Sequence, residues 1–219
     1  MSLRTGRKLS KVRSMNPLLE PIFKSPQLPD LVTELQEAWA AEQDRRRQFL
    51  NEITPSMKAE FIEGEFVMHS PARARHLSSV GNIYSSLWGF TKDRLLGQTF
   101  VEKCLVSLTR NDFEPDVVWF SEEKASEFDD DQMRFPAPDF VVEVLSESTE
   151  KNDRGVKFTD YALHGVQEYW IVDPKKKTVE QYVLEGGQKE FTLFEKLSHG
   201  TVISQVIEGF EIALDDIFK

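Results

Sequence analysis

The sequence predicts an α/β protein in which a mixed β-sheet is flanked by helices and carries additional β-hairpins. Three observations support this prediction. Apolar residues switch between helical and strand spacing in the order helix, three strands, helix, strand. Two glycine-containing turns separate short runs with strand character, as in hairpins. The chain has 219 residues, 40% hydrophobic and 29% charged, which is enough to bury a core and is not a disordered composition.

The chain divides into three expected parts: a basic segment over residues 1–28, a helix over 29–51 and a folded domain over 52–219. The first thirteen residues contain no acid, and their basic residues are Arg4, Arg7, Lys8, Lys11 and Arg13. A flexible tail, a phosphate-binding arm, a transit peptide and read-through before Met15 all fit this composition. The sequence does not choose among these four interpretations.

Two elements are expected in the next part of the chain. Residues 31–50 have helical spacing, which places on one stripe Leu31, Leu35, Trp39 and Ala40. Residues 59–62 and 65–68 flank Glu63-Gly64, a turn pair close to Asp-Gly. This pattern predicts a β-hairpin.

A long helix is expected from Arg73 to Leu96. Its apolar spacing predicts a buried face that consists of Leu77, Val80, Ile83, Leu87 and Phe90. Gly97 follows as a natural C-terminal cap, because glycine accepts the left-handed backbone that ends many helices.

Three strands are expected next, over residues 100–108, 116–120 and 139–145. The acidic stretch over 122–131 lies between the second and the third, and we interpret it as a solvated loop.

The last part of the chain alternates again between the two kinds of element. A helix begins at Ser148 or Thr149, ends at His164 and has Gly165 as its terminator. The strands expected after it cover residues 168–173, the hairpin pair 178–184 and 189–197, and 210–214, before a short acidic turn.

The candidate site is formed by acidic residues of two neighbouring strands. Asp116 and Asp139 each follow a proline, and aspartate is common at such strand starts for purely structural reasons. Glu143 differs, because its run otherwise has the pattern of a buried strand, where an unpaired carboxylate costs several kcal/mol. Strand periodicity places Glu143 on one face with Val141 and Leu145. A structural salt bridge would explain Glu143, but we favour a metal or catalytic site.

A lysine joins these carboxylates from the following helix, where Lys157 lies one turn in. Two acidic oxygen ligands and a cation around one point suit a hard divalent metal and an attacking water, the chemistry that hydrolyses phosphodiesters. Oxygen-only ligands favour Mg²⁺ or Mn²⁺ over zinc. No HExxH, GxSxG or Walker loop competes with this interpretation.

Composition limits the partners and the compartment. The net charge of −10 opposes the approach of nucleic acid, so affinity would need a local basic surface or a bound metal. A single cysteine, Cys104, excludes an intrachain disulfide and favours a reducing compartment, so we expect a cytoplasmic protein. No apolar run is long enough to cross a bilayer and no signal-peptide core is present, so we expect no membrane partner.

Five stretches resemble the Uma-type (Uma-two) putative restriction endonucleases of the PD-(D/E)XK superfamily. They cover residues 58–65, 114–118, 138–146, 153–161 and 165–173. The resemblance extends from about Glu52 to the C-terminus. It implies a restriction-endonuclease-like core and a Mg²⁺- or Mn²⁺-dependent endonuclease that hydrolyses DNA.

The resemblance also implies site residues. Asp116 matches the Pro-Asp carboxylate, Glu143 matches the acidic residue of the third strand, and Glu60 matches a glutamate that joins the acidic cluster. The superfamily lysine would lie at Leu145, and the resemblance implies that Lys157 supplies this cation instead. The metal would be held by Asp116, Glu143 and the backbone carbonyl of Val144, and Glu60 would bind a second ion or tune the first.

Three further residues are candidates for phosphate or substrate contacts. Arg154 and Tyr161 share a helix face with Lys157, spaced three and four apart, although packing at a helix edge explains them equally well. His76 could contact phosphate or the metal cluster, or be an exposed histidine at a helix start. The rival function is a catalytically silent fold that binds nucleic acid or protein. A homodimer is expected by analogy, because two-fold pairing suits the cutting of both strands.

Overall fold

The computed structural model describes residues 16–219, which divide after Arg47 into two compact units. The described part of the first unit contains a 3₁₀ turn, η1 (Pro17–Leu19), the short helix α1 (Glu20–Phe23) and most of α2 (Leu28–Glu52). The predicted helix over 31–50 is therefore confirmed. Since the division falls inside α2, the expected domain boundary between residues 51 and 52 stays a prediction.

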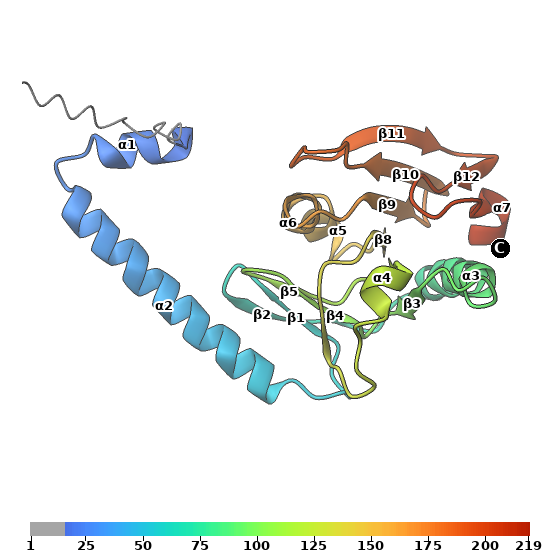
Figure 1. Cartoon of the computed structure of the whole chain (residues 1–219), viewed down its shortest axis with the longest axis horizontal. Coiled ribbons are helices and arrows are strands. Elements are labelled where there is room, and N and C mark those ends of the chain that lie inside the picture. Colours follow the sequence, from blue (N-terminus) through green and yellow to red (C-terminus); the bar gives the residue numbers. More distant parts are fainter. Residues whose placement is uncertain (1–15) are drawn as a thin grey trace, which may run out of the picture. The chain divides into compact units, whose positions relative to one another are not determined.

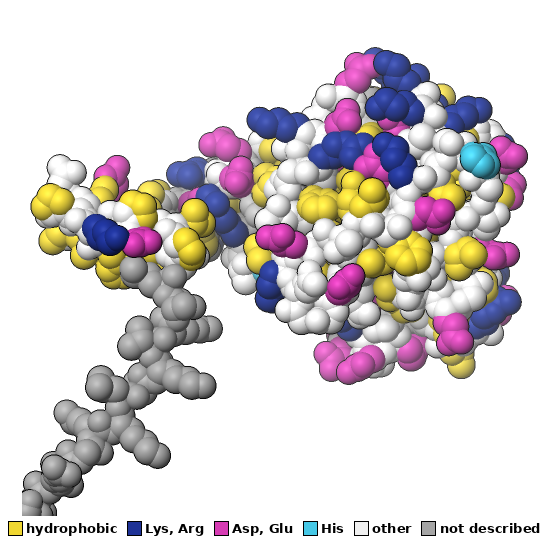
Figure 2. Space-filling view, turned by 90° about the horizontal axis from the view of Figure 1, so that it is seen from above, with side chains coloured by type: hydrophobic (Ala, Val, Ile, Leu, Met, Phe, Trp, Pro, Cys, Tyr) yellow, Lys and Arg dark blue, Asp and Glu magenta, His cyan; other side chains and the backbone are white. Residues whose placement is uncertain are grey.

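The apolar stripe of α2 lies at the surface of this first unit. Leu35 and Trp39 are exposed, as are Leu18 and Phe23 in the preceding turns. Figure 2 shows hydrophobic side chains, in yellow, beside charged ones on the surface of the helical segment. No helix between residues 16 and 219 is long and apolar enough to cross a membrane.

The predicted first hairpin is confirmed. Strand β1 (Ala59–Ile62) pairs antiparallel with β2 (Glu65–Met68), with Ile62 opposite Glu65. Glu63 and Gly64 both have positive φ, 49° and 89°, as a two-residue type I′ turn requires. The sequence pair Glu-Gly thus fixes the register of a strand that carries Glu60.

Two sheets form most of the second unit (Figure 1). One contains five strands in the order β2-β1-β5-β4-β7, and the other contains six in the order β11-β10-β9-β8-β6-β3. The remaining strands of the first sheet are β4 (Leu105–Ser107), β5 (Asp112–Phe113) and β7 (Arg134–Phe135). The strands of the second are β3 (Gln98–Val101), β6 (Val117–Phe120), β8 (Phe140–Val144), β9 (Glu168–Asp173), β10 (Thr178–Val183) and β11 (Thr192–Leu197). In the larger sheet β8 and β9 are parallel and all other neighbours antiparallel, which makes it mixed, as predicted.

The single strand expected over residues 100–108 is wrong. The chain forms β3 and β4 instead, and these belong to different sheets. Glu102, with a positive φ of 57°, turns the chain between them. The acidic stretch over 122–131 also contains a short helix, α4 (Glu122–Ala125), rather than only a loop.

Helix α3 (Ala74–Thr91) ends five residues before the predicted end. Gly97 therefore does not cap it. Its φ is +102°, and a Cβ there would lie 2.0 Å from the carbonyl oxygen of Phe120, so glycine permits a close backbone approach instead. Of the predicted buried face, Val80, Ile83 and Leu87 are buried, but Leu77 is exposed.

The helix expected over 148–164 is interrupted. It forms α5 (Glu150–Asp153) and α6 (Val156–Leu163), which Gly155 separates. A Cβ at Gly155 would lie 2.7 Å from the carbonyl oxygen of Lys151, so the break needs glycine. Gly165, at φ +81°, terminates α6 as predicted.

The C-terminal part adds one element that the sequence did not predict. Strand β12 (Thr201–Ile203) pairs with β13 (Glu211–Ala213), which lies inside the expected strand over 210–214. The expected acidic turn is a short helix, α7 (Leu214–Ile217). Figure 1 shows α7 beside α3.

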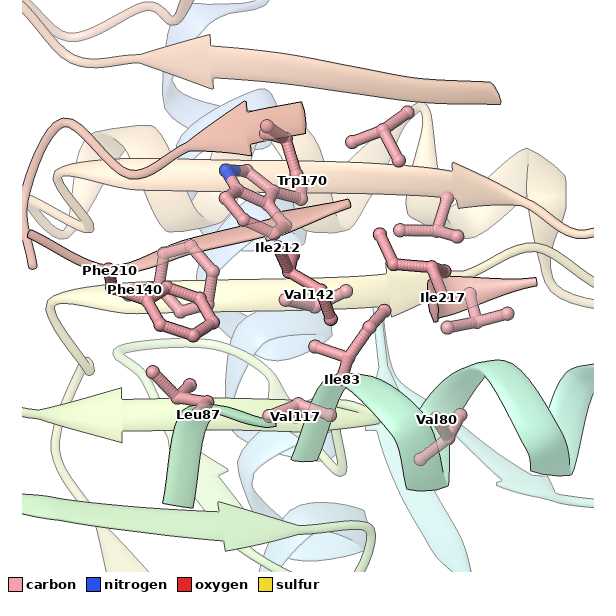
Figure 3. Close-up of a cluster of buried hydrophobic side chains, with 14 of the residues drawn as sticks. Val80, Ile83, Leu87, Val117, Phe140, Val142, Trp170, Phe210, Ile212 and Ile217 are labelled. Atoms are coloured by element: carbon pink, nitrogen blue, oxygen red, sulfur yellow. The ribbon is translucent and has the colours of Figure 1, made fainter. Parts of the chain in front are cut away.

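Alternate residues of the six-stranded sheet enter two hydrophobic clusters, one on each face. Figure 3 shows the cluster under α3, whose members include Val80, Ile83, Leu87, Val117, Val142 and Trp170. The cluster on the opposite face includes Val106, Phe113, Val118, Val141, Tyr161 and Ile171. Because α6 and the five-stranded sheet contribute to the second cluster, polar side chains on this face of β6 and β8 are enclosed.

Candidate active site

Asp116 and Glu143 lie on neighbouring strands and on the same face of the sheet. Val117 is paired with Val142 in the β6–β8 ladder, and continuing this antiparallel register brings Asp116 opposite Glu143. The Val144 N–H donates a 2.8 Å hydrogen bond to Oδ2 of Asp116. Glu143 shares its face with Val141, in the cluster that faces α6, as strand periodicity predicted.

Lys157 brings three carboxylates together. Its Nζ lies 2.8 Å from Oε1 of Glu60, 3.0 Å from Oε1 of Glu143 and 3.4 Å from Oδ1 of Asp153. Tyr161, one turn further along α6, donates a 3.3 Å hydrogen bond to the same Glu143 oxygen. Only 1% of Lys157 is exposed, so an ammonium and three carboxylates share a site that is closed to solvent.

Glu60 has both carboxylate oxygens engaged. Oε1 accepts a 2.8 Å hydrogen bond from the Glu114 N–H besides its contact with Lys157, and Oε2 lies 3.1 Å from Nε2 of His69. Burial raises the pKa of Glu60, but Lys157 and His69 more than offset this and hold the pKa below its ordinary value. Glu60 is therefore a charged anchor for Lys157.

Asp116 is paired on its other side with a histidine and a lysine. Oδ1 lies 3.4 Å from Nε2 of His76 and 3.5 Å from Nζ of Lys58. Burial raises the pKa of Asp116, but His76, Lys58 and the Val144 N–H outweigh burial and lower it. His76 is buried rather than exposed, because the first turn of α3 directs it towards β6.

Glu143 and Asp153 are less well compensated. Burial raises the pKa of each carboxyl, and the attraction of Lys157 offsets this only in part. Neither oxygen of Asp153 accepts a hydrogen bond of normal geometry, although only 1% of the residue is exposed. Sequence reasoning missed Asp153 as a site residue, and its position four residues before Lys157 was the available signal.

Arg154 and Asp139 lie outside this cluster. Arg154 makes a bidentate pair with Glu180, at 2.7 and 3.2 Å, and its Nε lies 3.0 Å from Glu150. The predicted helix face shared by Arg154, Lys157 and Tyr161 is wrong, because the break at Gly155 places Arg154 at the end of α5.

Asp139, the other Pro-Asp aspartate, has a structural role. Oδ1 lies 2.7 Å from Nζ of Lys124, and Oδ2 accepts a 2.8 Å hydrogen bond from the Ser121 N–H. It therefore fixes the start of β8 against the turn that follows β6, as expected for an aspartate at a strand start.

The donor chemistry of the cluster fits a hard divalent cation. All the candidate donors are carboxylate or carbonyl oxygens, and the buried Asp153 carboxylate accepts no hydrogen bond of normal geometry. Among the described residues, no three His, Cys, Asp or Glu side chains converge closely enough to coordinate an ion. Lys157 lies at the point where three of the carboxylates meet, so an ion would have to share or replace its contacts.

Three comparisons with known proteins found similar sequences and a similar structure. The sequence profile of Uma2, described as "Putative restriction endonuclease", matches residues 42–215. The "Uncharacterized protein sll1609" of Synechocystis sp. is 30% identical over 149 residues, which cover 67% of this chain and 82% of that protein. A solved structure of a putative nuclease belonging to DUF820, from Anabaena variabilis, has a TM-score of 0.65 and 20% identity, and the match covers 78% of this chain and 94% of that one. The chain therefore has the restriction-endonuclease-like fold.

Proposed function

The chain belongs to the Uma2 family of putative restriction endonucleases, and on this premise we propose that it is a metal-dependent endonuclease that hydrolyses DNA phosphodiester bonds. The family and the fold support a nuclease-like function. The metal dependence and the choice of DNA are the added steps of the proposal, and they rest on the chemistry of the cluster.

The observation that carries the proposal is the buried lysine between Glu60 and Glu143, next to Asp116. Burial alone lowers the pKa of an ammonium, but Glu143, Glu60 and Asp153 raise that of Lys157 well above its ordinary value. Lys157 therefore stays charged. Such a charge, held in a site of low dielectric, is suited to stabilise negative charge that develops on a phosphate oxygen.

Asp116 and Glu143 would hold Mg²⁺ or Mn²⁺, with the backbone carbonyl of Val144 as a further oxygen ligand. When bound, the ion supplies Lewis acidity towards the phosphate and lowers the pKa of a water. Lys157 would orient that water and offset the developing charge. Glu60 keeps Lys157 in place. Glu60 would also tune the metal site or bind a second ion.

A side chain can contact the substrate only if its polar atoms are not already bonded within the protein. His76 lies against Asp116, and its Nδ1 is buried without a hydrogen-bond partner, so it is our candidate for a phosphate contact. Tyr161 is committed to Glu143 and acts by orienting that carboxylate. Arg154 would have to give up its bidentate pair with Glu180 to reach a phosphate, so we assign it no substrate contact.

The proposal is tested by incubating the protein with supercoiled plasmid, linear duplex and single-stranded DNA, with and without Mg²⁺ or Mn²⁺. We expect Lys157→Ala to lower the cleavage rate at least about 100-fold, because it removes the charge that the transition state needs. Lys124→Ala is the matched control, since Lys124 also pairs with a buried aspartate but lies outside the cluster. It should cleave at the wild-type rate.

A second variant distinguishes loss of the Lys157 charge from loss of the fold in Lys157→Ala. Leu145 lies on the same strand face as Glu143, so Leu145→Lys in the Lys157→Ala background returns a cation to that face, and partial recovery of cleavage is expected. Wild-type cleavage by Lys157→Ala would refute the role of Lys157. Metal-independent cleavage would refute the proposed metal dependence. No cleavage of any substrate by the wild type would favour the rival function, a catalytically silent binding module.

A further inference from the structure

Asp153 is the carboxylate of the cluster whose oxygens accept no hydrogen bond of normal geometry; its looser neighbours are the side chains of Lys157 and Thr149. It lies at the end of α5 and is 1% exposed, and among residues 16–219 its ionic contact is with Lys157 Nζ at 3.4 Å. We infer that Asp153 is a further ligand of the divalent cation, an inference that rests on the proposed function. The observations that support it are the geometry of Lys157, the charge of the cluster and the contacts of Glu60.

The Lys157 ammonium lies closer to two of its three carboxylate neighbours than to the third. Glu60 and Glu143 approach its Nζ to 2.8 and 3.0 Å, which is hydrogen-bonding distance, while Asp153 stays at 3.4 Å. One ammonium faces three carboxylates, so the group has two negative charges in excess when all three are ionised. A divalent cation supplies two positive charges. A buried carboxylate that is only partly compensated is costly, and a cation at Asp153 reduces that cost.

Glu60 is less available for an ion than Asp153. Its two oxygens already accept from or contact Lys157, the Glu114 N–H and His69. Neither oxygen of Asp153 accepts a hydrogen bond of normal geometry, because Lys157 and Thr149 are only loose neighbours, and the break at Gly155 directs the end of α5 towards the same lysine. Asp153 can thus bind an ion without giving up a hydrogen bond, which Glu60 has to do.

A structural role for Asp153 makes the opposite prediction about stability. If Asp153 only paired with Lys157, its neutralisation would destabilise the metal-free protein. If it is an uncompensated ligand, neutralisation removes an unfavourable buried charge, and the metal-free protein should be as stable as the wild type or more stable. Stability without metal therefore distinguishes the two roles.

The experiment compares wild type, Asp153→Asn and the matched control Asp139→Asn, another buried aspartate, whose oxygens are both paired. Mn²⁺ binding is measured by electron paramagnetic resonance and thermal unfolding is measured without metal. For Asp153→Asn we expect the Kd for Mn²⁺ to rise at least about tenfold, since the charge of the ligands sets affinity, with an unchanged or higher Tm. For Asp139→Asn we expect a lower Tm and an unchanged Kd.

The outcomes separate this inference from the proposed function. If the wild type binds Mn²⁺ and Asp153→Asn binds it with the same Kd, the inference is overturned and the metal site itself stands. A lower Tm for Asp153→Asn with an unchanged Kd assigns Asp153 a purely structural role and overturns the inference as well. If the wild type binds no Mn²⁺, the proposed metal dependence fails together with the inference.

Discussion

Lys157 combines two properties that an isolated lysine does not have: it is buried, and it stays charged. The carboxylates of Glu60 and Glu143 hold its Nζ on two sides, and Tyr161 orients Glu143 from the same helix. Because these neighbours raise its pKa, Lys157 is suited to orient a water and to stabilise charge rather than to remove a proton.

The Glu114 carboxyl makes the stability of the protein depend on pH. Burial raises its pKa from 4.5 to about 7, although the Ala59 N–H and Lys58 lower it. Between pH 4.5 and about 7, the Glu114 carboxyl therefore keeps its proton in the folded protein, whereas it has lost its proton in the unfolded chain. The stability of the folded state that depends on this proton is fully present below pH 4.5 and is lost as the pH rises through about 7. The free energy involved is at most about 3 kcal/mol.

Glu114→Gln should remove most of that pH dependence, because the amide keeps an oxygen for the Ala59 N–H and has no charge to bury. The free energy of unfolding is measured by urea denaturation from pH 5 to pH 8. At pH 8 the variant should be more stable than the wild type, by on the order of 1–3 kcal/mol. Parallel pH profiles for the two proteins would show that Glu114 titrates as it does in the unfolded chain.

At the scale of elements, the break between α5 and α6 positions the site. Asp153 ends α5 and Lys157 lies in the first turn of α6, so their relative placement depends on Gly155. A Cβ at this position would meet the Lys151 carbonyl oxygen at 2.7 Å. Gly155→Ala should therefore destabilise the protein by about 1–3 kcal/mol and weaken Mn²⁺ binding.

Gly89→Ala is the matched control for this prediction. Gly89 lies in α3, and a Cβ there would meet nothing within 4 Å, so the substitution should stabilise the protein by about 0.5–1 kcal/mol. Chemical denaturation and Mn²⁺ titration of both variants make the comparison. A Gly155→Ala protein with wild-type stability and metal affinity would mean that the α5–α6 break does not position the site.

The elements that sequence reasoning predicted well are those that local residues determine. The turn at Glu63-Gly64 fixes its own hairpin, and Glu143 was recognisable as a charge within a buried strand pattern. The division of 100–108 into two strands depends on two different sheets, which no local pattern contains. Asp153 was missed for a similar reason, since an acid near the start of the helix expected from Ser148 or Thr149 is usually solvated, and its burial arises from the tertiary fold.

At the scale of the whole molecule, a net charge of −10 has to be reconciled with the proposed substrate, which is a polyanion. Acidic and basic side chains are interspersed on the face of the second unit that Figure 2 shows. The basic residues Arg4, Arg7, Lys8, Lys11 and Arg13 lie outside the described residues, so all four interpretations of the N-terminal segment stay open. The expected homodimer also stays a prediction. A cation held by the carboxylates would offset part of the local negative charge at the site.

The most direct test of the central claim is plasmid cleavage by the wild type and Glu143→Gln, with Mg²⁺, with Mn²⁺ and with a chelator. The substitution keeps the size of the side chain and removes its negative charge. This charge is proposed to bind the ion together with Asp116 and to hold Lys157 in place. We predict nicking by the wild type only when the metal is present, and a loss of at least about 100-fold in a Glu143→Gln protein that unfolds cooperatively. Cleavage that survives the chelator, or that proceeds equally fast in Glu143→Gln, would contradict the account.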